Sequence, residues 1–351
     1  MKIAVTCGGT GGHMFPGIAV ADELQKQGHD VRLILSGRGV ESGAPERWHD
    51  KIIIVPAKTT GIRGKFKRVW RYLRLFLIST PIAFFKLLMF RPKAILAMGS
   101  YTSIAPIVAA TALRIPRYLH ESNVLPGSAN RFASRFATKV FVAFDASMKY
   151  FKKDKCEVVG MPIREAISGI KWANPTNDFT ITIMGGSQGS QSVNEKAVEA
   201  MKQLVAEGLN IKVIHIAGKA NEEAVREMYP EGFPVELYGF TDKMPEIYSQ
   251  TSLCISRAGA ASCFELCTCG IPSIMIPLPR EANDHQRYNA QAMEQWGASK
   301  MLLQDALTSE QLANAVRDLY EHRDNLEKMS ACALEHTSEN VANKIIDYIC
   351  V

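Results

Sequence analysis

The chain has 351 residues, of which 47% are apolar and 22% are charged, and its formal net charge is +6. At ~100–200 residues per domain, this length predicts two domains, each large enough to bury a hydrophobic core. The composition excludes a disordered or a fibrous protein.

A short apolar run, KIAVT, opens the chain and leads into GGTGGH at residues 8–13. This order is typical of a strand, a glycine turn and a helix whose free N–H groups and positive dipole end face an anion such as phosphate. The loop is not G-x-G-x-x-G, and no G-x-x-x-x-G-K-[ST] occurs, which disfavours dinucleotide binding and P-loop hydrolysis. Because the start lacks the basic, apolar and cleavage segments of a secretory signal, we expect a cytoplasmic protein.

Residues 51–120 contain thirteen Lys and Arg and no Asp or Glu, so the other 281 residues carry a net charge of −7. A basic region in an otherwise acidic chain indicates an anionic partner, either nucleic acid or an anionic membrane surface. Within residues 64–81, apolar side chains recur every three or four positions and basic side chains lie beside or opposite them. The apolar face comprises Phe66, Val69, Trp70, Leu73, Phe76 and Leu77.

This composition favours a helix that lies in a membrane interface, within the basic segment 63–91, over nucleic-acid binding. The apolar run 75–90 is interrupted by Pro81 and Lys86 and is too short to span ~30 Å of hydrocarbon. We therefore expect a chain that lies on a membrane and does not cross it. The alternative is that the apolar face packs on the protein's own sheet and the basic face is solvated.

Short apolar runs alternate with helical patterns along the rest of the chain. This alternation predicts parallel sheets covered by helices on both faces, an α/β fold. The expected strands are 3–6, 31–35, 52–55, 94–97, 117–120 and 140–142 in the first half, and 180–184, 212–216, 235–238, 253–256 and 273–276 in the second. Residues 161–178 hold Pro, Gly and Asn but little apolar periodicity, and predict a hinge between a domain at 1–160 and a domain at 179–335.

The two halves resemble each other. With a shift of 177 residues, KIAVTCGGTGGH at 2–13 aligns with FTITIMGGSQGS at 179–190. Three polar clusters also follow expected strands, at the edge where open α/β sheets bind ligands: HESN at 120–123, SRAGA at 256–260 and NDHQRYNA at 283–290. Each cluster alone fits a loop or a helix cap, but together with the paired glycine loops they predict a ligand site.

These motifs resemble the N-acetylglucosaminyltransferase family that completes lipid II in peptidoglycan synthesis. The resemblance spans nearly the whole chain, in order. It rests on GGTGGH with Pro16, HESN with Pro126, Gly127 and Asn130, GMPIR at 160–164, GGSQG at 185–189, SRAGA with Ser262 and Glu265, and DHQ with Asn289 and Ala290.

The resemblance implies a GT-B fold, in which two Rossmann-like, doubly wound parallel-sheet domains face each other across a cleft. It implies an inverting transferase that moves N-acetylglucosamine from UDP-N-acetylglucosamine to the 4-hydroxyl of the N-acetylmuramoyl unit of lipid I, the undecaprenyl-pyrophosphoryl-N-acetylmuramoyl-pentapeptide. The enzyme would be peripheral, on the cytoplasmic face of the cell membrane. Residues 1–160 would bind acceptor and membrane, 179–335 would bind the UDP-sugar, and a helix in 336–351 would pack back on the N-terminal domain.

The chain contains no D-x-D, the usual metal-binding clamp for a diphosphate, so we expect neither a metal nor a cofactor and assign that work to helix N-termini and neutral donors. The resemblance places a donor site at Ser187 (phosphate), Thr241 (uracil, through its backbone), Ala260, Ala261 and Ser262 (phosphate loop), Glu265 (ribose), Gln286 and Asn123 (sugar), and Arg164. It places Thr10, Gly11 and Gly12 against the acceptor diphosphate. His13 is the leading candidate for the catalytic base, and Glu121 is the second.

Two positions depart from the family pattern: Ser122 replaces the glutamine of HEQN, and Met161 replaces the asparagine of GNPVR. Both changes remove amide donors. Two other functions remain open. One is another GT-B enzyme that uses UDP-N-acetylglucosamine, an epimerase or a soluble glycosyltransferase, for which no basic amphipathic segment is expected. The other is a non-enzymatic nucleotide-sugar or membrane-surface binding protein, which has no use for a base.

Overall fold

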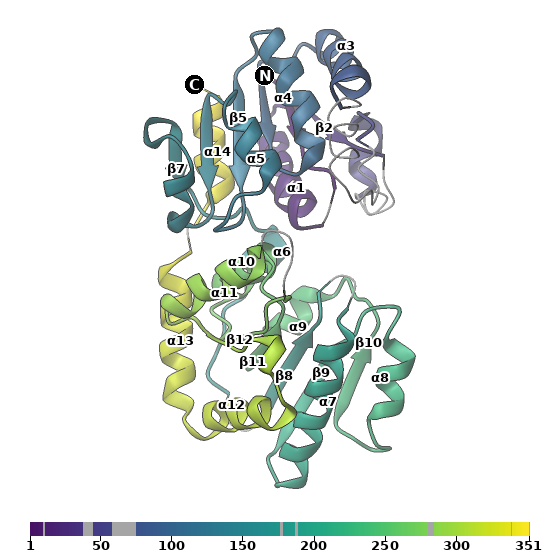
Figure 1. The fold of residues 1–351 in the computed structure, drawn as a ribbon, viewed down its shortest axis with the longest axis vertical. Coiled ribbons are helices and arrows are strands. Elements are labelled where there is room, and N and C mark those ends of the chain that lie inside the picture. The colour runs from purple at the N-terminus through teal and green to yellow at the C-terminus, as the bar shows by residue number, and fades with distance from the viewer. Residues whose placement is uncertain are drawn as a thin grey trace. The chain divides into compact units, whose positions relative to one another are not determined.

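The computed structural model describes residues 1–9, 11–37, 45–57, 75–175, 178–186, 189–279, 284–337 and 339–350 (Figure 1). The chain divides into two compact units. The first unit comprises Met1–Arg164 and Ser338–Val351, and the second comprises Glu165–Thr337. Each unit is a parallel sheet with helices on its faces, which is the α/β architecture that the alternating apolar runs predict.

The first unit has a seven-stranded sheet in the order β3-β2-β1-β4-β5-β6-β7. Its strands are β1 (Lys2–Thr6), β2 (Asp30–Leu35), β3 (Ile52–Ile54), β4 (Ala94–Ala97), β5 (Arg117–Glu121), β6 (Lys139–Val142) and β7 (Cys156–Val158). Its longer helices are α1 (Gly11–Lys26), α3 (Thr80–Phe90), α4 (Ile104–Ala112), α5 (Ser128–Ala133) and α14 (Val341–Ile349).

Successive residues of β1 serve opposite faces of this sheet, as the two-residue period of a strand requires. Ile3 and Val5 join a core with α1 and α14, whereas Ala4 joins a core with α3 and α4. The helix α14, drawn in yellow among the purple and blue elements of this unit, packs against α1 (Figure 1). The last helix of the chain thus completes the core that the first helix begins.

The second unit has a six-stranded sheet in the order β10-β9-β8-β11-β12-β13. Its strands are β8 (Phe179–Met184), β9 (Ile211–Ile216), β10 (Val235–Tyr238), β11 (Leu253–Ser256), β12 (Ser273–Met275) and β13 (Ser299–Met301). Its helices are α6 (Glu165–Ser168), α7 (Gln191–Ala206), α8 (Glu222–Met228), α9 (Met244–Gln250), α10 (Ala260–Cys269), α11 (His285–Gln295), α12 (Ser309–Glu321) and α13 (Arg323–Glu335).

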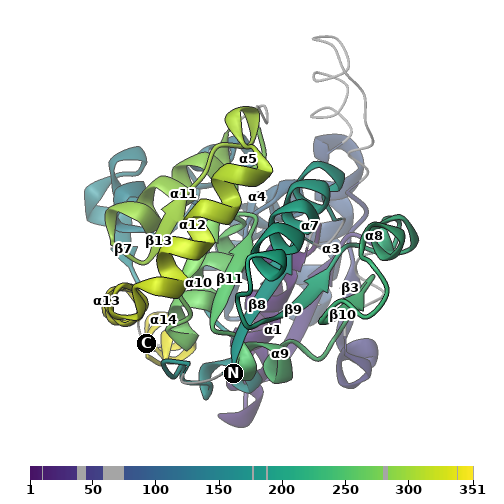
Figure 2. The same cartoon turned by 90° about the horizontal axis from the view of Figure 1, so that it is seen from below.

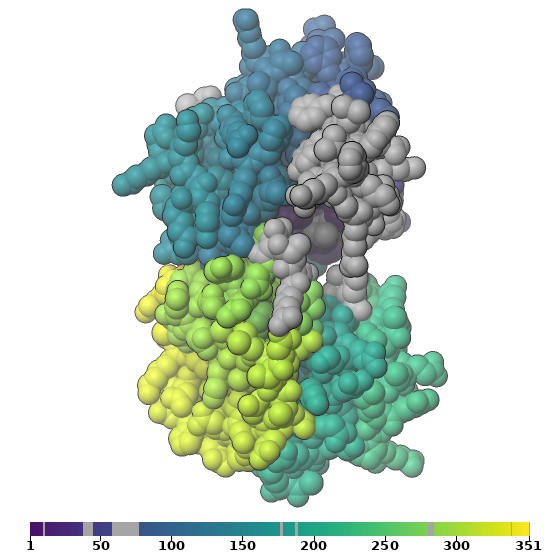
Figure 3. Space-filling view, in the orientation of Figure 1, coloured from purple at the N-terminus to yellow at the C-terminus, as the bar shows by residue number. Residues whose placement is uncertain are grey.

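Helices α7 and α12 lie side by side on one face of this sheet (Figure 2). They cover the side chains of Phe179, Ile181 and Ile183 from β8. In the space-filling view, the yellow-green and yellow atoms of α12 and α13 form part of the outer surface of the unit (Figure 3).

All eleven expected strands are present, each within two residues of its expected ends. The strands β7 and β13, which the sequence analysis missed, are three-residue strands at sheet edges, and each contains polar residues that interrupt an apolar run. The interfacial helix expected at 64–81 falls mostly outside the described residues. Pro81 does not interrupt the run after it, because it lies in the first turn of α3, where proline is tolerated.

The described part of the chain contains no helix that is both long enough and apolar enough to cross a bilayer.

The packing of α14 gives a first prediction. Ile345 is fully buried in the core of the first unit, so Ile345→Ala should lower the free energy of unfolding by ~2–5 kcal/mol through lost burial and the cavity left behind. Urea denaturation would measure the loss. The matched control is Lys344→Ala, one position earlier on the exposed face of the helix, which should change stability by less than ~0.5 kcal/mol. Equal stability of the two variants would contradict the packing.

Candidate active site

Both units carry a loop at the point where the strand order reverses. In the first unit the order reverses between β1 and β4, and in the second between β8 and β11. Open parallel sheets bind ligands at such switch points, because the loops that leave neighbouring strands there diverge and leave a crevice at the carboxyl edge. The two glycine loops, at residues 8–13 and 185–190, follow β1 and β8. The fold therefore places both loops where a ligand is expected.

The two loops share a backbone conformation only in part. Gly9 (φ +111°) and its equivalent Gly186 (φ +85°) both adopt the left-handed region, which a glycine enters without steric cost. Helix α1 then begins at Gly11, whereas α7 begins only at Gln191. The backbone conformations of the two loops are therefore alike as far as Gly9 and Gly186 and differ after them. Thr10 and Ser187, two of the expected site residues, lie outside the described residues.

His13 lies in the first turn of α1 and is oriented by the loop after β4. Its Nδ1 is 2.8 Å from the carbonyl oxygen of Met98. A carbonyl only accepts, so Nδ1 carries the proton and the lone pair of the neutral ring is on Nε2. Gly11 and Gly12, the other expected acceptor residues of this loop, are the first residues of the same helix. The geometry thus gives His13 the tautomer that a general base needs.

The Glu121 carboxylate, which is buried with 1% exposure, is held by four N–H groups of the segment that follows it. Its Oε1 accepts from the backbone N (2.9 Å) and Nδ2 (3.2 Å) of Asn123. Its Oε2 accepts from the backbone N of Gly127 (3.3 Å) and from Nδ2 of Asn130 (2.8 Å). Both oxygens are therefore engaged in fixing the loop between β5 and α5, which makes Glu121 a weaker candidate for the base than His13.

The loops that carry His13 and Glu121 meet at Gly99, which has a φ of +96°. A Cβ on Gly99 would lie 2.9 Å from Nδ2 of Asn130 and 3.3 Å from Cε1 of His13. Next to them, the Nε2–H of His120 donates to the carbonyl of Gly160 at 2.9 Å. Complete burial lowers the pKa of His120 to about 4, so its ring is neutral at pH 7.

The expected phosphate loop of the second unit is the N-terminus of α10. Gly259 precedes the helix in an extended conformation, with no side chain capping the first turn, which contains Ala260, Ala261 and Ser262. The free N–H groups of such a turn bind anions. One turn further, Oε2 of Glu265 accepts a hydrogen bond of 3.1 Å from the hydroxyl of Tyr248, so the carboxylate is oriented by a buried phenol.

Arg257 is a residue whose role the sequence analysis did not recognise, although it named the SRAGA cluster. Its side chain is buried with 5% exposure. It donates to the carbonyl of Ile276 (3.0 Å), to Oγ of Ser190 (2.5 Å) and to Oε1 of Gln304 (2.5 Å). The guanidinium thus connects the loop after β11, which carries it, to the glycine loop after β8 and to residues after β12 and β13, and it supplies a buried positive charge at the switch point. An arginine directly after a buried apolar strand was the signal for it.

The remaining expected residues of the second unit lie on neighbouring loops. Gln286, in the first turn of α11, accepts from the backbone N of Leu278 at 3.0 Å. Asn289, one turn later, donates to the carbonyl of Ala258 at 3.1 Å and so ties α11 to the phosphate loop. Thr241 follows β10, at the same carboxyl edge of the sheet.

Two residues expected at the donor site, Asn123 and Arg164, belong to the first unit. The guanidinium carbon of Arg164 lies 4.7 Å from the ring centroid of Phe15 on α1. The two departures from the family pattern, Ser122 and Met161, are both buried in this unit. Among the described residues, no hydrogen-bond partner faces the hydroxyl of Ser122.

The buried histidines predict an acid-sensitive fold. Burial lowers the pKa of both His120 and His215 to about 4, against about 6.5 in an unfolded chain. Below pH 6.5 the unfolded chain therefore binds more protons, and stability that is complete above pH 6.5 is lost as the pH falls toward 4. At pH 5 the loss should be ~2 kcal/mol per histidine, at ~1.4 kcal/mol per pH unit.

Urea denaturation at pH 7 and pH 5 would measure this loss. His120→Gln should reduce the difference between the two pH values by about half, because one of the two titrating groups is gone. A variant with the same pH dependence as the wild type would show that His120 does not carry the effect.

Two family descriptions match the chain, each over one of the two sheets. Residues 3–142 match the Glycosyltransferase family 28 N-terminal domain, and residues 180–345 match the Glycosyltransferase family 28 C-terminal domain.

Curated relatives match over nearly the full length. A Geobacter sulfurreducens protein is 33% identical over 99% of this chain and 97% of its own length, and a Myxococcus xanthus protein is 33% identical over 100% and 92%. Both are named UDP-N-acetylglucosamine--N-acetylmuramyl-(pentapeptide) pyrophosphoryl-undecaprenol N-acetylglucosamine transferase.

Solved structures agree with the sequence relatives. The crystal structure of Acinetobacter baumannii MurG superposes with a TM-score of 0.81 at 28% identity and covers 99% of both chains. A Neisseria meningitidis UDP-GlcNAc 2-epimerase has a TM-score of 0.71 over all of both chains but only 14% identity, so it shows a shared fold alone. Both sheets carry a glycine loop at the expected switch point, and relatives match the full length at 33% identity. The chain therefore belongs to glycosyltransferase family 28 and has its GT-B fold.

Proposed function

We propose that this chain transfers N-acetylglucosamine from UDP-N-acetylglucosamine to lipid I and so forms lipid II. The observation that carries the proposal is the full-length relationship to transferases that bear this name, at 33% identity over 99% of the chain. The chemistry of both switch-point loops fits it. The epimerase and natural-product glycosyltransferase structures that resemble this chain share 13–14% identity with it and therefore show a shared fold alone.

The second unit holds the donor through its diphosphate. The first turn of α10 offers free N–H groups, and the Arg257 guanidinium lies buried beside the neighbouring glycine loop. Both stabilise the negative charge that develops on the oxygen of the leaving UDP, and both are fixed before the reaction, so no reorganisation is required. Ser187 adds a hydroxyl to the same phosphates.

The rest of the donor extends along the carboxyl edge of the same sheet. Glu265, oriented by Tyr248, accepts hydrogen bonds from the two ribose hydroxyls, and the backbone of Thr241 pairs with the uracil. Gln286 hydrogen-bonds the sugar, and Asn123 and Arg164 are further proposed contacts of the donor. Neutral and charge-assisted hydrogen bonds of this kind give the site its specificity for a nucleotide sugar.

The first unit activates the acceptor. Nε2 of His13 takes the proton of the acceptor 4-hydroxyl as the hydroxyl oxygen forms a bond to the anomeric carbon. The bond between that carbon and the UDP oxygen breaks in the same displacement, and UDP leaves with the electron pair, so the configuration inverts. The carbonyl of Met98 holds Nδ1–H and stabilises the imidazolium that forms. Thr10, Gly11 and Gly12 face the diphosphate of the acceptor.

The next prediction compares the two candidates for the catalytic base, His13 and Glu121. With UDP-N-acetylglucosamine, a water-soluble lipid I analogue and excess chelator, the wild type should form the disaccharide. His13→Ala should lower kcat by ~10²–10⁴-fold, the usual contribution of a general base, and leave UDP affinity unchanged by calorimetry. Glu121→Gln should mainly lower the melting temperature, because an amide cannot accept all four hydrogen bonds that fix the loop.

The donor-side control is Glu265→Ala, which should weaken UDP binding by ~1–3 kcal/mol. If His13→Ala retained its kcat while Glu121→Gln lost kcat at unchanged stability, the base would be Glu121. A wild type without disaccharide product, or active only after Mg²⁺ or Mn²⁺ is restored, would contradict the proposed reaction or its metal-free diphosphate site.

The first unit meets its lipid-linked substrate on an anionic membrane surface. Helix α3 is apolar on both sides: Ala83, Leu87 and Phe90 are buried in the core, while an outer apolar patch faces solvent. We define the α3 patch as Phe85 (62% exposed), Leu88 (45%) and Met89 (80%) on α3, together with Leu77 (66%) and Ile78 (47%) in the π-helical turn Leu75–Ser79 that precedes it. The exposed Lys86, Arg91 and Lys93 lie beside it.

Contiguous exposed apolar side chains bordered by basic residues are typical of a surface that enters the headgroup region of an anionic bilayer. The α3 patch therefore supports a peripheral enzyme at a membrane surface, and the proposed reaction assigns it to the cytoplasmic face. The rest of the basic segment, residues 63–74, lies outside the described residues.

The α3 patch predicts vesicle binding. Phe85→Ser with Met89→Ser should reduce binding to phosphatidylglycerol vesicles by at least ~10-fold, because burial of each side chain among acyl chains contributes ~1.5–3 kcal/mol. Flotation at several salt concentrations would measure it, and turnover of a water-soluble acceptor should stay unchanged. Val158→Ser, which alters an exposed apolar residue at a sheet edge (43% exposed), is the control. Unchanged vesicle binding of the double variant would remove the patch from the membrane contact.

A further inference from the structure

A chain of buried hydrogen bonds lies behind the glycine loop of the second unit. The hydroxyl of Tyr229 is 2.9 Å from Nδ1 of His215, and Nε2 of His215 is 3.2 Å from Oδ1 of Asn194. Nδ2 of Asn194 in turn donates to the carbonyl of Ala217 at 3.0 Å. We call these four groups the His215 chain. His215 and Asn194 are fully buried and Tyr229 is 8% exposed, so the chain is shielded from water.

The hydrogen bonds of the His215 chain all point one way. A carbonyl only accepts, so Asn194 turns its NH₂ group to Ala217 and presents Oδ1 to His215. His215 must then carry its proton on Nε2, and its Nδ1 accepts the proton of the Tyr229 hydroxyl. Burial lowers the pKa of His215 to about 4, which keeps the ring neutral and this arrangement fixed at physiological pH.

The end of the His215 chain supports the glycine loop directly. The Cα of Gly189, at φ +73°, lies so close to the carbonyl of Ala217 that an added Cβ would overlap this oxygen. The backbone N of Gly189 closes a turn onto the carbonyl of Gly186 at 2.9 Å. The backbone N of Asn194 bonds the carbonyl of Ser190 at 2.9 Å. Asn194 and Ala217 thus hold both the loop and the first turn of α7.

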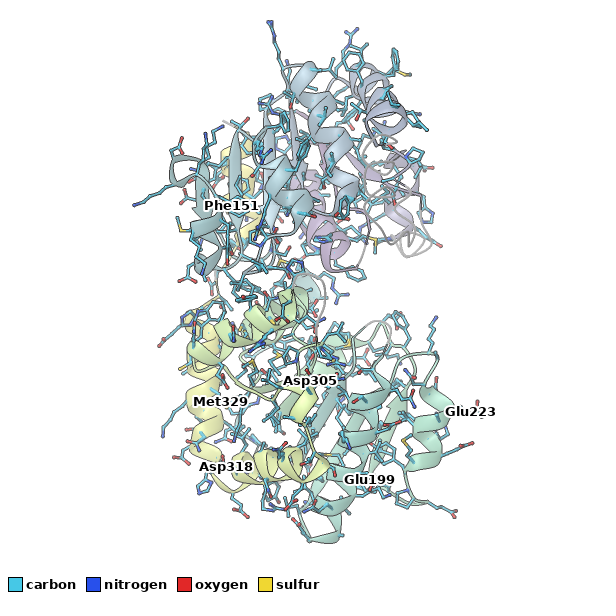
Figure 4. All side chains as sticks on the ribbon, viewed as in Figure 1. Phe151, Glu199, Glu223, Asp305, Asp318 and Met329 are labelled. Carbon is cyan, nitrogen blue, oxygen red and sulfur yellow. The ribbon has the colours of Figure 1, made fainter. Side chains whose placement is uncertain are left out.

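The outer face of α7 makes contacts along the helix itself. Glu199, labelled in Figure 4, is exposed and pairs with Lys202, one turn along the same helix. Asn194, by contrast, lies on the buried face of α7.

We propose that His215 is a positioning residue for the donor diphosphate: through Asn194 and the carbonyl of Ala217 it fixes Gly189 and Ser190 at the end of the glycine loop, although it lies behind the loop and touches no ligand itself. The inference rests on the proposed function, which places the donor phosphates on this loop. It assigns the affinity for a nucleoside diphosphate to a buried chain that contains no phosphate-binding group.

A matched pair of substitutions separates positioning from packing. In His215→Gln the amide nitrogen occupies about the place of Nε2, so the donor to Asn194 is kept and the acceptor of Tyr229 is lost. In His215→Asn the shorter amide reaches only Tyr229, and Asn194 loses its donor. Each variant loses one buried hydrogen bond, so a purely structural role predicts equal losses of stability and no difference in ligand affinity.

Positioning predicts a difference between the two variants. By calorimetry, His215→Asn should bind UDP ~10-fold more weakly than the wild type, the effect of a buried group left without its partner. His215→Gln should stay within ~3-fold. Uridine, which lacks the phosphates, should bind the wild type and both variants with the same affinity. In turnover, the KM for UDP-N-acetylglucosamine should rise in His215→Asn more than kcat falls.

Two further variants keep the test decisive if His215→Asn folds poorly. Tyr229→Phe removes only the far end of the chain and should leave UDP affinity within ~2-fold. Asn194→Asp replaces the NH₂ group that donates to the carbonyl of Ala217 with an oxygen that cannot donate. This variant should bind UDP as weakly as His215→Asn and should bind uridine with the affinity of the wild type.

The control for general destabilisation is Thr251→Val. This substitution removes two buried hydrogen bonds of the same unit, to Oγ1 of Thr182 (2.7 Å) and to the carbonyl of Ile247 (2.7 Å), and should leave UDP affinity unchanged.

Equal UDP affinity of the Gln and Asn variants, whether unchanged or reduced, would overturn the inference. A wild type that fails to bind UDP would instead overturn the donor site of the proposed function.

Discussion

The structure depends on how the backbone leaves β1 and β8. Each strand is buried between helical layers, and each must reverse into a helix whose first N–H groups have no partner within the helix. A glycine in the left-handed region makes the turn possible, at Gly9 in the first unit and at Gly186 in the second. Both turns lie where the strand order reverses, which is where open parallel sheets bind ligands. Helix N-termini at such a position can bind an anion.

Buried hydrogen bonds fix a loop in each unit, and the two units use different chemistry for this. In the first unit a buried carboxylate, Glu121, collects four N–H groups of the loop after β5. In the second unit a neutral histidine, His215, connects a phenol to an amide that holds a carbonyl. A buried polar group without a partner is costly in a low dielectric, so each arrangement has few competing alternatives. In the first unit these bonds fix Asn123, and in the second they fix the carbonyl of Ala217 next to Gly189.

The same framework also separates two kinds of chemistry. At the position after the shared glycines, the first unit has His13, whose Nε2 is left with a lone pair because Nδ1 donates to Met98. The equivalent position in the second unit is Ser190, whose hydroxyl accepts from Arg257. A proton acceptor in one unit and a buried positive charge in the other are the two requirements of a glycosyl transfer with a diphosphate leaving group. Equivalent loops of the two units thus carry different groups, a histidine with a lone pair on Nε2 in the first and a serine that contacts an arginine in the second.

Sequence alone determined the order of the elements and the location of the glycine loops. Short continuous apolar runs identified eleven strands, because strands that are buried on both faces require them, and the loop motifs carried the resemblance to the transferase family. The sequence did not reveal β7 and β13, since a three-residue edge strand needs little apolar content. Nor did it reveal that Arg257 reaches Ser190 across 67 residues of sequence, or that the carboxylate of Glu121 is occupied by its own loop. Only the tertiary structure decides such contacts, because hydrogen bonds between segments far apart in sequence depend on which loops the sheet order makes neighbours.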